Sequence, residues 1–320
     1  MKQQKWQQRK WTRGAVALVA VLALVTAGCS SKKSTTTTSS GGSATTSAAG
    51  GGTKVRITSQ SFNEELTLAQ VYGQYLKAKG FDVTIERPIG SRKQIFSALK
   101  AGSVDLVPDY AGSAATELDK TGTPSPDKAK TYARLTAALK GSGLVAAASS
   151  PAQDANALVA LSSWATTNKV TTISDLKKVE SKVTLGGAPE CADRPDCFKG
   201  YEGPVYGLKL KGFKAVSYGP PLVAGLKADT IQVAQYQTTA PEIASGEIVV
   251  LKDDKGLQGA DNIVPILRSA ASNPALIKAL DALSAQLTDA DLAAWNKATD
   301  VDKSEPVDVA KKWLQSKGLI

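Results

Sequence analysis

The chain has 320 residues and a formal net charge of +10, from 39 lysines and arginines against 29 aspartates and glutamates. It contains no histidine, which excludes histidine-dependent catalytic triads and the usual zinc sites. No arginine-rich stripe interleaved with aromatic residues occurs, so we expect no nucleic-acid partner.

Residues 1–28 predict an export signal. Residues 1–14 carry five lysines and arginines and no acid, and a short apolar run, AVALVAVLALVTAG, leads up to Cys29. A basic segment, an apolar core and small residues before the cleavage point are typical of a secretory signal peptide. The alternative is a membrane span, for which the apolar run is short. The sequence LVTAGC resembles a lipobox, which implies that Cys29 is lipidated.

Residues 29–53 predict a flexible, lipid-anchored linker. The segment after Cys29 has no large apolar residue, so it cannot form a core. Its 24 residues give a reach of about 27 Å for a flexible chain. We therefore expect an extracytoplasmic protein tied to the outer face of the cell membrane. Loss of the five leader charges leaves a net charge of about +5, which is ordinary for a soluble domain.

The first part of the remaining chain alternates predicted strands and helices. The expected strands are 54–60, 81–87 and 104–110, and the expected helices are 63–80 and 91–102. Ser91 and Gln94 have capping-box spacing, while Glu64 and Glu65 lie in a first helical turn, where acids suit the helix dipole. This alternation predicts a parallel α/β sheet.

The rest of the chain continues the pattern and then becomes helical. We expect a helix over 126–141 and strands over 157–163, 182–187 and 248–256. From residue 273 onward the sequence predicts helices, one of them capped by Thr288. Trp295 and Trp313 fall on apolar helix faces and are expected in the core.

Tyr110 ends the third predicted strand, and small residues, Ala-Gly-Ser-Ala, follow it. Ligands of open parallel sheets bind outside the carboxyl ends of the strands. The small residues leave the ring uncovered and the backbone approachable, so Tyr110 is a candidate ligand contact. The alternative is ordinary packing at the edge of the core.

Besides Cys29, the chain has two cysteines, Cys191 and Cys197, in the segment ECADRPDC. In an exported protein a close pair of cysteines indicates a disulfide. A metal site would lack further soft ligands, and a nucleophilic thiol would lack a histidine partner.

Several segments together resemble the substrate-binding proteins of osmoprotectant ABC importers, the ProX-type group that binds glycine betaine, choline and related quaternary amines. They are ITSQSFNEELTLAQVYGQYLKAKGFDV, IFSALKAGSVDLVPDYAGSA, LGGAPECADRPDC with VYGLKLKGFK, VLKDDKG with IVPILR, and ALDALSAQLTDADLAAWNKATDVD. The resemblance implies an α/β, two-lobed periplasmic-binding-protein fold of type 2, in which each lobe is a mixed, mainly parallel sheet flanked by helices. We expect lobe I over 54–153 and 241–320 and lobe II over 154–240, with hinge crossings near 153–157 and 237–241.

The resemblance also implies a cage of tyrosines around a trimethylammonium group. Tyr110, Tyr206 and Tyr236 match its aromatic positions. Ser113 falls where a threonine can bond the ligand's polar tail, and Arg194 where an arginine grips a carboxylate. An aromatic face attracts such a diffuse cation through its quadrupole, so we expect rings without an acidic counter-ion.

Two positions depart from the family's pattern. Asn156 stands where a fourth cage tyrosine is usual, and Gln60 stands near the place of an early lysine. Both amides can form hydrogen bonds with a ligand. We therefore expect a ligand richer in hydrogen-bonding groups than glycine betaine, such as carnitine, or one outside the quaternary amines.

The leading hypothesis is a monomeric receptor, without cofactor or metal, that delivers a quaternary amine to an ABC permease in the cytoplasmic membrane. A second is the same receptor fold with another small polar or aromatic ligand. A third is an interaction lipoprotein that binds a partner. An enzyme is disfavoured, because the sequence has neither histidine nor a paired-carboxylate motif.

Overall fold

The computed structural model describes residues 51–320, so the predictions for the signal peptide, Cys29 and most of the linker lie outside it. The strands are β1 Lys54–Ile57, β2 Asp82–Ile85, β3 Leu106–Tyr110, β4 Leu144–Ala146, β5 Asn156–Leu161, β6 Thr184–Gly187, β7 Gly212–Ala215, β8 Val233–Gln237, β9 Ile248–Val250 and β10 Ile263–Arg268. The α-helices are α1 Asn63–Ala78, α2 Arg92–Ala101, α3 Ala111–Leu118, α4 Lys128–Leu139, α5 Ser162–Asn168, α6 Phe198–Glu202, α7 Pro220–Lys227, α8 Pro241–Ala244, α9 Pro274–Ser284, α10 Asp289–Asn296 and α11 Pro306–Ser316. Within this part of the chain, no helix combines the length and apolarity needed to cross a membrane.

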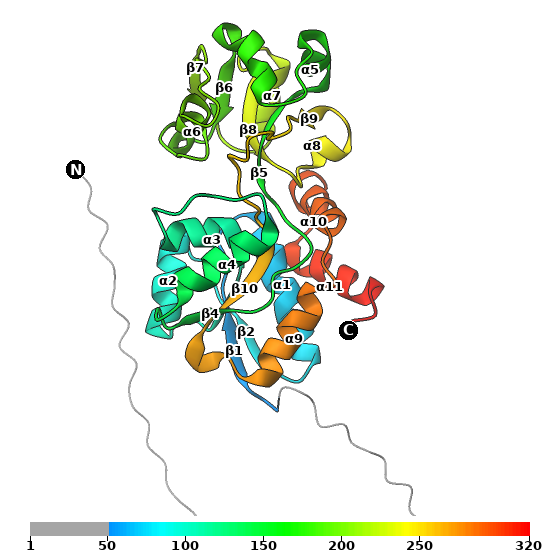
Figure 1. Cartoon of the computed structure of the whole chain (residues 1–320). Helices are drawn as coiled ribbons and strands as arrows, with labels where there is room; N and C mark the ends of the chain where they lie inside the picture. Colours follow the sequence, from blue (N-terminus) through cyan, green and yellow to red (C-terminus); the bar gives the residue numbers. More distant parts are fainter. Residues whose placement is uncertain (1–50) are drawn as a thin grey trace, which may run out of the picture. The chain divides into compact units, whose positions relative to one another are not determined.

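Lobe I is built on a five-stranded sheet with the order β2-β1-β3-β10-β4. Strands β1, β2 and β3 are parallel, and β10 runs antiparallel to both of its neighbours. Helices α1, α9, α10 and α11 cover one face, while α2, α3 and α4 cover the other (Figure 1). The expected pair Trp295 and Trp313 packs edge to face in this core, with ring centroids 5.1 Å apart.

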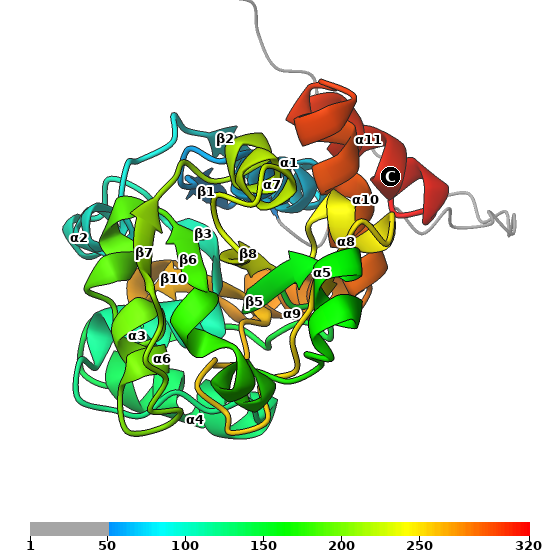
Figure 2. The same ribbon diagram turned by 90° about the horizontal axis from the view of Figure 1, so that it is seen from above.

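Lobe II repeats this plan with the order β7-β6-β8-β5-β9. Strands β6, β7 and β8 are parallel, and β5 runs antiparallel to β8 and β9. Helices α6 and α7 lie on opposite faces of the sheet (Figure 2). Two mixed sheets, each with one reversed strand and flanking helices, confirm the expected fold class.

The chain passes between the lobes twice, and the reversed strands β5 and β10 begin where each crossing ends. The two crossing segments are hydrogen-bonded to each other: Asp154 N–H donates to the Asp261 carbonyl at 3.1 Å, and Ile263 N–H donates to the Ala152 carbonyl at 3.1 Å. The first crossing lies between β4 and β5, and the expected 153–157 overlaps its end and the first two residues of β5.

The expectation that the second crossing lies near 237–241 needs correction. Strand β9 pairs with β5 through Val159 and Val250, so the chain stays in lobe II until after residue 250. The fifth strand of that sheet has to be completed before the chain returns. Lobe II therefore extends beyond 240, and the return crossing lies between β9 and β10.

Most predicted elements form where their signals place them. Ser91 caps α2 by accepting from the Gln94 N–H, and Gly102 ends the helix in the left-handed conformation. Thr288 and Asp291 form a capping box at α10. Helix α3 is not among the predicted elements. The small residues after Tyr110, expected to leave the backbone approachable, form a helix against α4 and β3.

Candidate functional site

Two cavities lie between the lobes. The larger has a volume of about 560 Å³ and is lined from lobe I by residues such as Phe62 and Tyr110, and from lobe II by Arg194 and Gln237. The smaller, of about 270 Å³, also contacts Phe62 and Gln237 and is lined by Tyr218 from lobe II. Because they share Phe62 and Gln237 in their linings, the two cavities are neighbours and together form one candidate site.

The strand directions explain why functional side chains gather here. Parallel strands bring their carboxyl ends to one edge of a sheet, and the segments that follow them form the binding surface. Phe62 follows β1 and Tyr110 ends β3 in lobe I, while Tyr218 follows β7 and Gln237 ends β8 in lobe II. The two sheets thus point their carboxyl edges at the same space.

Each lobe contributes a pair of aromatic rings. Phe62 and Tyr110 stack with centroids 6.1 Å apart and planes 21° apart. Tyr218 and Tyr236 stack at 4.9 Å and 26°. Phe62 is 38% exposed and Tyr218 is 46% exposed, so each pair presents one accessible ring beside a buried one.

Six of the seven ligand positions expected from the sequence line this site. Those at the larger cavity are Gln60, Tyr110, Ser113, Asn156 and Arg194. Tyr236 lines the smaller cavity, and its hydroxyl donates to Glu242 at 3.2 Å.

Tyr206 does not join them, which corrects the expected three-ring cage. Its side chain lies in the core of lobe II, with its ring centroid 6.3 Å from that of Tyr201. Its hydroxyl donates to Asp253 and accepts from the Lys255 N–H at 2.9 Å. Tyr206 therefore holds the turn after β9, and the second ring of lobe II is Tyr218.

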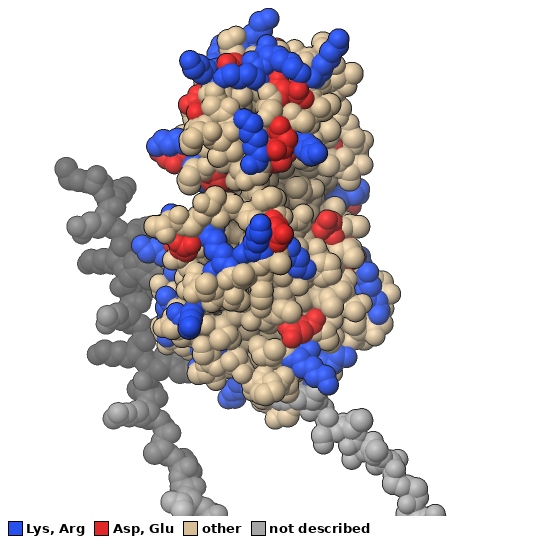
Figure 3. All heavy atoms as spheres, in the orientation of Figure 1, with Lys and Arg blue, Asp and Glu red and all other residues tan. Residues whose placement is uncertain are grey.

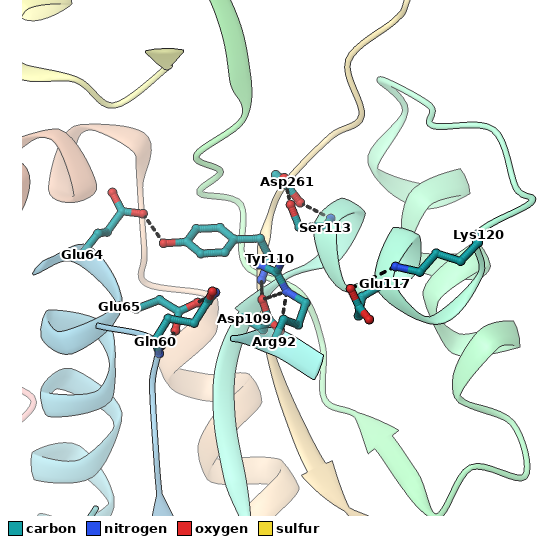
Figure 4. A network of polar contacts seen from close by, with 10 residues as sticks. All are labelled: Gln60, Glu64, Glu65, Arg92, Asp109, Tyr110, Ser113, Glu117, Lys120 and Asp261. Atoms are coloured by element: carbon teal, nitrogen blue, oxygen red, sulfur yellow. Dashed lines mark hydrogen bonds and ion pairs between the residues drawn. The ribbon is translucent and has the colours of Figure 1, made fainter. Parts of the chain in front are cut away.

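The expectation of rings without an acidic counter-ion is also wrong. The Tyr110 hydroxyl donates to Glu64 Oε1 at 2.7 Å (Figure 4). Glu64 is 4% exposed and also accepts from Thr239 at 3.1 Å and from Asn296. Burial raises the pKa of Glu64 despite these hydrogen bonds. Thr239 belongs to lobe II, so this carboxyl group connects the lobes.

A second polar layer supports Tyr110 from below (Figure 4). The Arg92 guanidinium donates to both Asp109 oxygens, at 2.9 and 3.0 Å. The Gln60 amide donates to Glu65 Oε1 at 2.8 Å. Burial, aided by the charge of Asp109, raises the pKa of Glu65 to about 8. The amide at position 60 thus binds a buried carboxyl group, which the sequence did not indicate.

Ser113 and Arg194 are engaged by neighbouring carboxylates. Ser113 donates to Asp261 through both its N–H and its hydroxyl, each at 2.7 Å. Burial raises the pKa of Asp261 to about 6. Arg194 pairs with Asp196 in the loop closed by the expected Cys191–Cys197 disulfide, whose Cα atoms are 5.3 Å apart.

Sequence reasoning missed three contributors: Phe62, Tyr218 and Asp154. Phe62 and Tyr218 come within a few residues of the carboxyl ends of parallel strands, the same position that singled out Tyr110. Asp154 lies in the first crossing, 3% exposed, and accepts from the Thr239 N–H at 3.1 Å. Burial and then the charge of Glu64 raise the pKa of Asp154 well above its ordinary value.

Two α/β lobes joined by two crossings, with a lined cavity between them, define a two-lobed binding protein of the periplasmic type. Residues 53–316 match the family described as the substrate binding domain of ABC-type glycine betaine transport system, and the chain belongs to this family. The membership confirms the resemblance drawn from the sequence. The family is a transport component rather than a class of enzyme.

Curated relatives and solved structures agree with this assignment. The chain is 27% identical over 278 residues to a glycine-betaine-binding protein of Pseudomonas aeruginosa, covering 83% of this chain and 88% of that protein. It is 23% identical to the glycine betaine-binding protein YehZ of Escherichia coli, over 82% of this chain and 90% of the relative. A crystal structure of a glycine betaine/carnitine/choline ABC transporter has a TM-score of 0.71 at 21% identity, covering 83% of this chain and 99% of that one. Apo YehZ from Escherichia coli has a TM-score of 0.66 with the same identity and coverage. These two structures support the fold.

Proposed function

We propose that the protein captures a quaternary-amine ligand of the glycine betaine, choline and carnitine class between its lobes and delivers it to an ABC permease. The observation that carries the proposal is the meeting of two aromatic pairs, one from each lobe, at one cavity system. The names of the curated relatives favour the same ligand class.

The rings supply an interaction suited to this ligand. A quaternary ammonium group has no N–H to donate, and its diffuse charge is attracted to ring faces while its methyl groups are buried against them. Each ring contributes about 0.5–2 kcal/mol. The two accessible rings would therefore contribute roughly 1–4 kcal/mol, and micromolar affinity requires about 8 kcal/mol. Burial of the methyl groups, at about 0.8 kcal/mol each, and hydrogen bonds to the rest of the ligand would supply the difference.

The proposal also covers where the protein is located and its oligomeric state. Export by residues 1–28 and lipidation of Cys29 would hold the receptor at the outer face of the cell membrane, next to its permease. A disulfide between Cys191 and Cys197 suits an oxidising, extracytoplasmic compartment. We propose that the protein acts as a monomer and binds its ligand without turnover. Replacing Cys29 by serine should release the protein from the membrane fraction.

Calorimetric titration of the mature protein with glycine betaine, choline and carnitine tests the function. We expect micromolar binding of at least one of them. Phe62→Ala and Tyr218→Ala should each weaken that binding about tenfold, since each removes an accessible ring. Tyr206→Phe is the matched control and should leave the affinity unchanged, because Tyr206 lies in the core of lobe II. Folded protein that binds none of these ligands would contradict the proposal.

A further inference from the structure

The cations that line the larger cavity already have carboxylate partners. Arg92 pairs with Asp109 at 2.9 Å, Lys120 with Glu117 at 3.0 Å, and Arg194 with Asp196. In each case the two partners belong to the same lobe and the contact is made without a ligand. A ligand carboxylate would have to compete with these pairs for each guanidinium or ammonium group.

The smaller cavity has more acids than cations in its lining. It is lined by three acids, Glu64, Glu242 and Asp300, and by Lys303. The Lys303 ammonium group donates to the Asp300 carbonyl at 2.6 Å. On the face shown in Figure 3, lysines and arginines gather at the end of lobe II away from lobe I, and others lie among acidic side chains on lobe I.

Two buried carboxyl groups, in contrast, lack a cation. Glu64 and Asp154 both bind Thr239, the first at its hydroxyl and the second at its N–H, each at 3.1 Å. Asp154 lines the larger cavity, and its Oδ2 atom has no hydrogen-bond partner among residues 51–320. A buried, unpartnered carboxylate oxygen is strongly unfavourable unless a positive charge approaches it.

The charged groups that act on this pair are acidic. Asp300, which follows α10, faces Glu64, and Asp261 of the return crossing faces Asp154. The rings belong to the same environment. Burial first, and then the charges of Asp154, Glu64 and Asp300, raise the pKa of Tyr218. A cation held by the rings would therefore lie in a strongly negative field.

We propose that the site selects ligands with a net positive charge over zwitterions, with the Glu64–Asp154 pair as the counter-charge. This inference rests on the proposed function and names its ligand class: a quaternary ammonium alcohol, such as choline, rather than glycine betaine or carnitine. The hydroxyl of such a ligand needs only neutral partners, which Asn156 and Gln237 supply in the larger cavity. The carboxylate of a zwitterion would meet paired arginines and uncompensated acids.

The same arrangement predicts that cation binding releases a proton. Burial raises the pKa of both Glu64 and Asp154, helped by the charge of Asp300 at Glu64 and by the charge of Glu64 at Asp154, so the empty pair retains its protons to a higher pH than ordinary carboxyl groups do. A bound cation favours the ionised form, and the proton passes to the buffer. The groups facing the pair are Tyr110 on β3, Thr239 before α8, Asn296 on α10, Asp300 after it and Asp261 on the return crossing.

Titration calorimetry of the mature protein with choline and glycine betaine at pH 7.5 is the first test. We expect choline to bind at least tenfold more tightly. Glycine betaine binding as tightly as choline, or more tightly, would overturn the inference and leave the proposed function intact. Failure of folded protein to bind either ligand would remove the proposed function, and this inference with it.

Asp154→Asn is the second test, because it removes the charge and nearly preserves the shape. Choline affinity should fall at least tenfold and glycine betaine affinity less than threefold. Asp82→Asn, an exposed position at the start of β2, is the matched control and should change neither. Equal losses for both ligands would indicate a structural role for Asp154 and contradict the proposal.

The third test needs no variant and so does not depend on how Asp154→Asn folds. Choline affinity of the wild-type protein should rise at least threefold between pH 6 and pH 8, and glycine betaine affinity should change less. Titrations in buffers of different ionisation heat should show proton release on choline binding. A choline affinity that does not change with pH, with no proton released, would overturn the proposed counter-charge.

Discussion

Gly112 lies where two distant segments of the chain meet. A Cβ atom at this position would lie 2.6 Å from the Ala260 carbonyl oxygen and 3.0 Å from Asp261 Oδ1. The small residues after Tyr110 therefore accommodate the return crossing. The sequence indicated instead that they leave the backbone open to a ligand.

Replacing Gly112 by alanine should destabilise the protein by about 1–3 kcal/mol, since the backbone it would meet has to move. Urea unfolding measures the change. Gly90→Ala is the control, because the nearest atom to its Cβ is a side-chain oxygen of Gln94 at 3.4 Å. Equal stabilities of the two variants would show that the return crossing does not constrain position 112.

Glu65 should make the stability depend on pH. Its pKa is about 8 in the folded protein against an ordinary value of 4.5. Between these values the unfolded chain has released a proton that the folded protein retains, so the free energy of unfolding falls as the pH rises. The decrease from this group is at most about 1.4 kcal/mol per pH unit.

Urea unfolding at pH 5 and pH 8 tests this prediction. Glu65→Gln should lose less stability than the wild type between these two pH values, because its amide does not titrate. Glu305→Gln, at an exposed position, should follow the wild type. A Glu65→Gln variant with the wild-type pH dependence would assign the effect to other groups.

At the scale of elements, local signals decide where helices begin and end. Thr288 accepts from the Asp291 N–H, and Asp291 in turn accepts from the Thr288 N–H at 3.0 Å. Asp291 also accepts from the Trp313 indole at 2.8 Å, which connects the start of α10 to α11. One cap therefore supports the packing of two helices.

Thr288→Ala should lower the free energy of unfolding by about 1 kcal/mol, the usual effect of losing such a cap. Thr288→Ser, which keeps the hydroxyl, should restore most of it. Thermal and urea unfolding measure both variants. If Thr288→Ser is no more stable than Thr288→Ala, the threonine methyl group, rather than the cap, stabilises the helix.

Hydrophobic periodicity and caps predicted most elements but not how they pair. The alternation in β1 and β2, the apolar run of β3 and the caps of α2 and α10 are local features, so the sequence shows them. The reversed direction of β10 depends on contacts with β3 and β4, far away in the chain. The three-residue strand β9 continues the lobe II sheet past 240, and nothing in its own sequence shows which lobe it joins.

At the scale of the whole molecule, the site depends on which strands of lobe I and lobe II have carboxyl ends that face each other. Tyr110 could be predicted because it ends a recognisable strand, and Tyr236 because it matches an aromatic position of the family that the sequence resembles. The sequence does not show that Tyr218, rather than Tyr206, lines the site. The burial of Tyr206 in the core of lobe II depends on its contacts with Tyr201 and Asp253. The role of Glu64 was hidden for a similar reason: Thr239, one of its partners, lies on the other lobe.

A crystal structure of the choline complex tests the central claim most directly. The account predicts the trimethylammonium group between Phe62 and Tyr218, with its nitrogen within about 6 Å of both ring centroids, and the lobes closed around it. A ligand bound beside Tyr206, or outside the space between the lobes, would contradict the account.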